Sequence, residues 1–152
     1  MTSYLNSTLP NLPRGLRNNN PGNLIQTNIP WKGKVPLSQN TDTRFEQFYE
    51  LRYGIRALML DLYNDFYKGK NTVTQLISEF APHFENNTDA YIRSVINGIG
   101  SNVIGTLTEE KLIGLSKAIV LMENGVKYKN YITDNDYKQA VAILGKPLKK
   151  KA

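Results

Sequence analysis

The stretch that decides the fold is TLTEEKLIGLSKAIVLMENG, residues 106–125. Its first four residues, from Thr106 to Glu109, have capping-box spacing, and Asn124-Gly125 supplies a stop signal. Between these ends, apolar residues recur at intervals of three and four: Leu112, Leu115, Ile119 and Met122. The pattern predicts a helix over about 107–124 with one face in the core.

Glu123 follows the apolar face of this helix, four residues after Ile119 and eight after Leu115. Helical geometry therefore predicts that its side chain points inward, at the last turn of the helix. Burial and the negative end of the helix dipole both disfavour a carboxylate, so we expect a raised pKa. The alternative is a Glu123 that is exposed at a fraying end, or paired with Lys117 or Lys127.

The rest of the chain predicts four more helices and one hairpin. We expect helices over about 54–68, from 71 to 80, from 87 or 88 to 98, and over about 134–144. Residues 24–48 alternate short apolar and polar stretches and predict a small, irregular β-hairpin, which Pro30 and Pro36 would confine to edge strands. The fold class is therefore mainly α (α+β), with about five helices and a small N-terminal β-hairpin.

Length and composition favour one domain over residues 1–152, with 1–13 and 146–152 extended or flexible. The chain lacks cysteine and has one histidine, His83, which excludes thiolate chemistry and sulfur-based zinc sites. We expect no metal and no cofactor. The sequence shows no secretory signal and no apolar run long enough to span a membrane.

The formal net charge is +6, and the chain ends in a basic tail that includes Lys149 to Lys151. This charge favours anionic partners, whether nucleic acid, anionic lipid or the acidic polymers of a bacterial envelope, or it serves solubility alone. No recognised nucleic-acid motif accompanies it.

Several other side chains are candidates for a site. Glu85 is a second candidate for catalysis, and one of Asp42, Glu46 and Glu50 could face a cleft beside the hairpin. Aromatic residues such as Trp31 and Tyr91 offer flat apolar faces that suit a carbohydrate.

Taken together, RGLRNNNPGN (14–23), Trp31-Lys32-Gly33, Gly54-Ile55-Arg56-Ala57 and Glu85-Asn86-Asn87-Thr88 resemble a family of phage virion structural proteins with a lysozyme-like fold. Asn19-Asn20, Trp31-Lys32-Gly33 and Thr88-Asp89-Ala90-Tyr91 are also similar to bacterial glucosaminidases and lytic transglycosylases. Those families place the catalytic Glu on a helix before the hairpin, whereas residues 1–18 contain no acidic residue. We therefore hypothesise a circular permutation that moves the catalytic helix to residues 118–125.

The resemblance implies a virion-associated enzyme that cleaves peptidoglycan glycan strands, either as a lytic transglycosylase or as a muramidase or glucosaminidase. It would be made in the host cytoplasm and act on the cell envelope, with other virion proteins as partners. Glu123 would be the general acid, and Asn19, Asn20, Asn23, Trp31, Tyr91 and Asn124 would bind sugar. The alternative is a non-catalytic virion component that keeps the lysozyme-like scaffold.

Overall fold

The computed structural model describes residues 2–80 and 88–149. In chain order, its helices are α1 (Arg14–Arg17), α2 (Leu51–Tyr67), α3 (Val73–Ser78), α4 (Thr88–Ile99), α5 (Glu109–Asn124), the 3-10 helix η2 (Val126–Tyr131) and α6 (Asp134–Ala142). All five helices predicted from the sequence are confirmed, with small shifts at their ends. The short helices α1 and η2 were not predicted, because each contains too few residues to show a periodic apolar face.

Side-chain caps fix where several helices begin. The Thr72 hydroxyl accepts from the backbone N–H of Gln75 and begins α3, and Thr133 accepts in the same way from Asp136 and begins α6. In α5 the cap is Thr108, so the predicted capping box at Thr106 is wrong. Leu107 is buried at this point, which places the chain in the core before the helix begins.

The predicted β-hairpin is wrong. Residues 24–48 form only isolated antiparallel bridges, between Ile25 and Phe45 and between Lys34 and Phe48, and no extended strand occurs in the described part of this segment. Many backbone groups of this segment instead form hydrogen bonds with side chains. The Gln26 amide, for example, donates to the carbonyls of Asp42 and Phe45.

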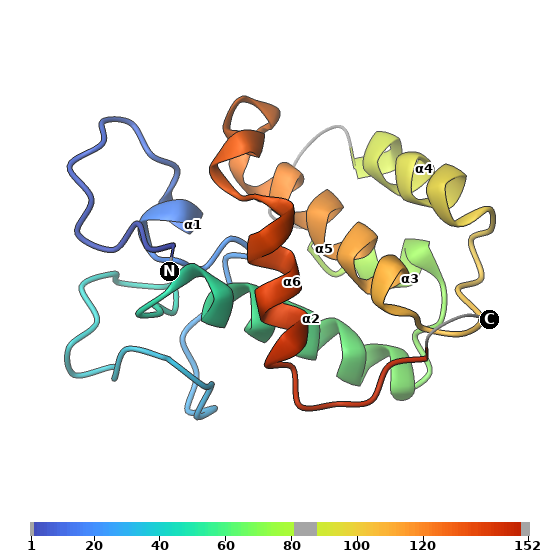
Figure 1. Ribbon diagram of the computed structural model, residues 1–152, viewed down its shortest axis with the longest axis horizontal. Helices are drawn as coiled ribbons and strands as arrows, with labels where there is room; N and C mark the ends of the chain where they lie inside the picture. Colours follow the sequence, from blue (N-terminus) through green and yellow to red (C-terminus); the bar gives the residue numbers. More distant parts are fainter. Residues whose placement is uncertain (1, 81–87, 150–152) are drawn as a thin grey trace.

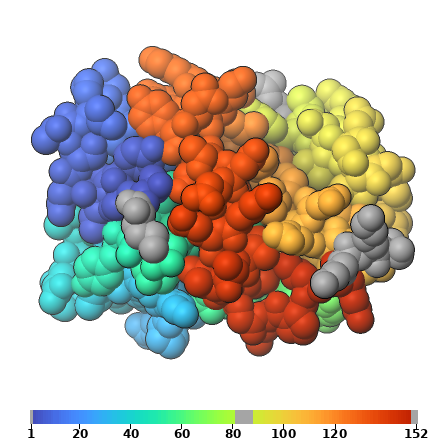
Figure 2. Space-filling view, viewed as in Figure 1, coloured from blue at the N-terminus to red at the C-terminus, as the bar shows by residue number. Residues whose placement is uncertain are grey.

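Helix α5 runs through the middle of the helical half of the molecule, with α2 below it, α6 crossing in front and α4 at its far side (Figure 1). The apolar faces of these helices meet in one core that includes Ile55, Leu58, Leu62, Leu115 and Ile119. Residues 2–50, mostly loops, form the other side of the molecule (Figure 2). The C-terminal end of α5 therefore faces a wall built from the first fifty residues.

Residues 2–13 and 146–149 carry no helix, but contacts hold them against the helices. The Thr2 hydroxyl donates to the Asp136 carboxylate at 2.7 Å, and the Tyr4 hydroxyl donates to the backbone carbonyl of Tyr131. At the other end, the Tyr63 hydroxyl donates to the carbonyl of Pro147 at 3.1 Å. These bonds join the chain ends to the body that the helices form.

Candidate functional site

The asparagine-rich loop after α1 is held by its own side chains. Asn19 lies in the left-handed region at φ 52°, which asparagine tolerates better than most residues. Its amide group donates to the carbonyl of Phe48 at 2.9 Å, and its Oδ1 accepts from the backbone N–H of Tyr4 at 2.8 Å. Asn19 thereby ties the N-terminal segment to the end of the 24–48 loop.

Asn20 performs a similar task one residue later. Its amide group donates to the carbonyls of Leu24 and Glu46, both at 3.0 Å, and its Oδ1 accepts from the N–H of Leu24. Asn19 and Asn20 are both fully buried, with 0% exposure. Their amides are therefore used inside the protein, and the predicted role in sugar binding is corrected to a role in shaping the loop.

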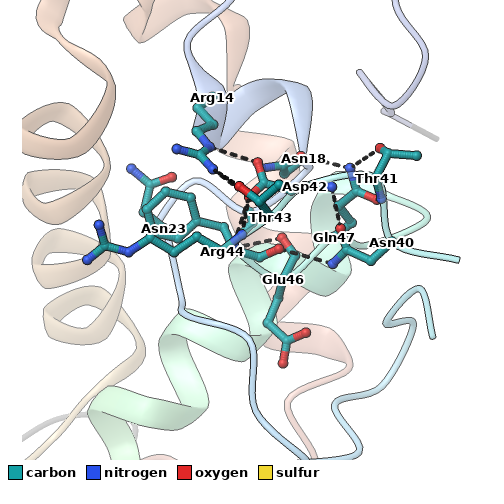
Figure 3. Close-up of polar contacts among 12 residues, drawn as sticks. Arg14, Asn18, Asn23, Asn40, Thr41, Asp42, Thr43, Arg44, Glu46 and Gln47 are labelled. Atoms are coloured by element: carbon teal, nitrogen blue, oxygen red, sulfur yellow. Dashed lines mark hydrogen bonds and ion pairs between the residues drawn. The ribbon is translucent and has the colours of Figure 1, made fainter. Parts of the chain in front are cut away.

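Asp42 is the centre of a second network in this wall (Figure 3). Its carboxylate accepts two hydrogen bonds of 2.8 Å from the Arg14 guanidinium and one of 2.9 Å from the Asn18 amide. The backbone N–H groups of Arg44 and Phe45 add two more, each 2.8 Å. Arg14 is the main reason that the pKa of Asp42 is held far below its usual range. The Asp42 carboxylate therefore stabilises the loop, and it is not free to act as a second carboxylate that faces a cleft.

Glu46 and Glu50 are likewise occupied. The Glu46 side chain is fully buried, pairs with the Lys34 ammonium at 2.9 Å, and points away from the Asp42 network in Figure 3. Glu50 pairs with Arg52 at 2.9 Å. All three carboxylates that the sequence suggested as partners for the catalytic acid are therefore engaged in ion pairs: Asp42 and Glu46 within the loop wall, and Glu50 with a near neighbour at the start of α2.

We expect Asp42→Asn to destabilise the protein by about 2 kcal/mol at pH 7, because charge-assisted hydrogen bonds from Arg14 and the backbone are lost. The folded pKa is depressed, so the stabilisation by Asp42 is present above its unfolded pKa and disappears as the pH falls below about 4. Urea denaturation at pH 7 and pH 3 measures this. Equal destabilisation at both pH values would contradict the ionic role.

Glu123 lies at the C-terminal end of α5, where Asn124 is the last helical residue and Gly125 leaves the helix at φ 89°. Its side chain turns inward, as the helical spacing predicts, and meets the asparagine-rich loop. The Asn23 amide donates to Glu123 Oε1 at 2.7 Å, which links positions 100 residues apart. Neither alternative ion pair forms, because Lys117 binds Asp134 at 2.7 Å and the Lys127 ammonium lies over the Tyr128 ring.

The surroundings of Glu123 disfavour its charged form. Burial raises its pKa from 4.5 to about 7, and the hydrogen bond from Asn23 offsets part of that rise. Glu123 Oε2 is buried and accepts no hydrogen bond from any described residue, and the same holds for Oδ1 of Asn23 and of Asn124. A carboxylate here would lie among acceptors with few donors, so the protonated acid is favoured up to near-neutral pH.

The raised pKa of Glu123 predicts a pH-dependent stability. The folded protein keeps this proton up to about pH 7, whereas the unfolded chain releases it near 4.5, so the free energy of unfolding falls as pH rises through this window. As the pH rises from 5 to 8.5, the free energy of unfolding of Glu123→Gln should increase by about 2 to 3 kcal/mol relative to that of the wild type. Urea denaturation at both pH values measures the difference.

The matched control for this measurement is Glu110→Gln, which changes an exposed glutamate of the same helix. Its effect on stability should be small and the same at both pH values. An equally pH-independent effect of Glu123→Gln would show that the Glu123 carboxyl is not desolvated.

Asn23 also borders a hollow of about 480 Å3 that contains Trp31 and Asp61. Asp61 is not among the site residues predicted from the sequence, although it lies between Leu58 and Leu62 of the apolar face of α2. Burial, followed by the nearby Asp65 charge, raises the pKa of Asp61 to about 6. An acidic residue inside a helical apolar stripe is the signal that could have identified it.

The remaining predicted residues lie elsewhere or fall outside the description. Tyr91 borders a separate hollow of about 680 Å3 between α4 and α5, whose lining does not include Glu123. Asn124 is nearly buried, and its amide group donates to the carbonyls of Pro21 and Val120, which anchors the end of α5 to the loop.

Glu85 and His83 lie outside the described residues. Within residues 2–80 and 88–149, no three acidic or histidine side chains gather in a way that could hold a metal ion.

None of the helices in residues 2–80 and 88–149 combines the length and apolar character that crossing a membrane requires.

No family model matches the chain. Protein P5 of Pseudoalteromonas phage PM2 is 36% identical to it over 117 residues, which cover 74% of this chain and 71% of the phage protein.

Proposed function

We propose that this chain, which belongs to the family of protein P5 of Pseudoalteromonas phage PM2, cleaves the glycan strands of bacterial peptidoglycan as a virion-associated enzyme. Membership in this family makes the chain a phage protein. The cleavage activity and the virion location are our proposals.

One observation carries the proposal: Glu123 is a largely buried carboxyl, held by Asn23 at 2.7 Å, and burial raises its pKa to about 7. Cleavage of a glycosidic bond needs an acid that still holds its proton near neutral pH, because the leaving oxygen must be protonated as the bond breaks. Helix α5 positions this acid against the asparagine-rich loop, where its hydrogen-bond partner Asn23 also lines the hollow that contains Trp31.

In the proposed reaction, Glu123 donates its proton to the glycosidic oxygen, and a nucleophile attacks the anomeric carbon. Since Asp42, Glu46 and Glu50 are engaged in ion pairs, the substrate itself is a suitable nucleophile, through the muramyl 6-hydroxyl or an acetamido oxygen. In the first route the 6-hydroxyl passes its proton to the Glu123 carboxylate and the product has an anhydromuramic end; in the second, water opens the oxazolinium intermediate, passes a proton to Glu123 and leaves a reducing end.

The contact between Glu123 and Asn23 supports the circular-permutation hypothesis. In the families that the sequence resembles, the acid precedes the asparagine loop, whereas here it follows the loop by 100 residues and still touches it. We propose on this basis that the scaffold is lysozyme-like.

A second candidate function is a non-catalytic virion component that keeps this scaffold. The observation that favours it is the burial of Glu123 Oε2, together with the bond between Oε1 and Asn23, because a catalytic acid must reach its substrate. In this case the Glu123 carboxyl serves only to join α5 to the loop.

A zymogram with purified bacterial cell walls separates the two functions. The enzyme produces a cleared band at the mass of the chain, and mass spectrometry of the released muropeptides identifies the new end. Absence of clearing by folded protein, across pH 5 to 8, would leave the non-catalytic function.

A further inference from the structure

Two neighbouring hollows lie between α2 and the loop that follows the asparagines. The first, of about 480 Å3, runs from Asn23 past Trp31 to Asp61. The second, of about 390 Å3, extends from Trp31 and Asp61 to Asn64. Because Ile29, Trp31 and Asp61 line both, the hollows adjoin, and we call them together the Trp31 groove.

The Trp31 groove begins at Asn23, the residue that holds the candidate acid. Asn23 lines its first hollow and also donates to Glu123 at 2.7 Å. Asn23 is therefore the residue that joins the groove to the Glu123 carboxyl, although Glu123 itself lines neither hollow.

One wall of the groove is held in place by a buried ion pair. The Lys34 ammonium pairs with Glu46 at 2.9 Å and also donates to the carbonyls of Thr27 and Ile29 at 2.7 and 3.1 Å. Glu46 in turn accepts from the backbone N–H of Thr27 at 3.2 Å. These bonds fix the loop over α2, so the groove is already formed without a ligand.

The lining combines apolar faces with hydrogen-bonding groups. Trp31 supplies a flat indole, and Ile29 is an exposed apolar side chain beside it, with 47% exposure. Asp61 supplies a carboxyl group that accepts hydrogen bonds from hydroxyl groups, and Asn64 adds an amide. A sugar ring presents the complementary surface, with C–H faces above and below and hydroxyl groups around its edge.

We propose that the Trp31 groove binds consecutive N-acetylated sugar units of a glycan strand, with Trp31 stacking on one ring and Asp61 accepting hydrogen bonds from its hydroxyl groups. The identity of the ligand rests on the proposed function. The location of the groove on α2 and the role of Asp61 rest on the lining itself.

Trp31 is the only tryptophan, so fluorescence reports directly on the groove. The probe is a tetramer of N-acetylglucosamine, titrated into Glu123→Gln protein to prevent cleavage. We expect a saturable fluorescence change, and in the double variant with Asp61→Asn a Kd weakened about tenfold, the size expected for one lost charge-assisted hydrogen bond. Asp134→Asn, the same change at an exposed site on α6, should leave Kd unchanged.

Circular dichroism establishes that each variant is folded. If Asp61→Asn does not fold, Asn64→Ala, an exposed position at the far end of the groove, replaces it and should weaken binding several-fold. Absence of a fluorescence change, or binding that is equal in all folded groove variants, would overturn the proposal. If the protein binds the tetramer but the wild type does not clear cell walls, the proposed cleavage activity is refuted and the proposed glycan binding by the groove still holds.

Discussion

Replacing Glu123 with glutamine is expected to reduce cell-wall cleavage by about 10²- to 10⁴-fold, the contribution typical of a general acid. Glutamine keeps the shape of the side chain and can still accept the hydrogen bond from Asn23, but it has no proton to donate. Release of soluble muropeptides from purified walls measures the loss. In the wild type, the rate should also fall as the pH rises above about 7, because Glu123 then loses the proton that it donates.

The control for this loss is Glu110→Gln, which should keep full activity. Cleavage retained by Glu123→Gln but lost in Glu85→Gln would transfer the acid role to Glu85. The Glu123→Gln protein should gain stability relative to the wild type between pH 5 and pH 8.5, so its urea denaturation separates loss of activity through unfolding from loss of the proton donor.

The helical half of the fold could be predicted from sequence because its signals are local. Apolar spacing and capping residues defined five helices, and the phase of the stripe in α5 placed Glu123 on its inner face. A helix has a fixed geometry, so the direction of one side chain follows from its neighbours along the chain.

The loop half could not be predicted in the same way, because long-range side-chain bonds shape it. Asn19 and Asn20 look like exposed loop residues in the sequence, yet each binds backbone groups of distant segments and is fully buried. Asp42 similarly depends on Arg14, 28 residues earlier. Long-range side-chain bonds of this kind leave no periodic pattern in the sequence. The β-hairpin prediction is wrong because these bonds replace the backbone hydrogen bonds of a strand pair.

The two halves depend on each other at the site. Glu123 comes from the predictable half and Asn23 from the other, and their contact gives the carboxyl its surroundings. Changes that displace the loop should therefore affect Glu123 even when they lie far from it. The two halves also pack closely at Gly54, where α2 meets the asparagine-rich loop.

Gly54→Ala is expected to cost about 3 to 5 kcal/mol of stability, the range of severe core substitutions. Gly54 lies in α2, and a Cβ at this position would lie 1.6 Å from the backbone carbonyl oxygen of Asn19. Neither group can rotate away, so the loop or the helix must shift. In an unobstructed helix a Gly→Ala change would stabilise the protein by about 1 kcal/mol, so the sign of the change in stability tests the close contact at Gly54.

Gly114→Ala is the matched control, because Gly114 lies in α5 and a Cβ there would meet nothing within 4 Å. Urea denaturation followed by circular dichroism should show Gly114→Ala at or above wild-type stability and Gly54→Ala far below it. A Gly54→Ala protein as stable as the wild type would mean that Asn19 does not pack on α2 as described. Any folded Gly54→Ala protein should also lose cell-wall cleavage, because a shift of Asn19 displaces Asn23 and removes the hydrogen bond that orients Glu123.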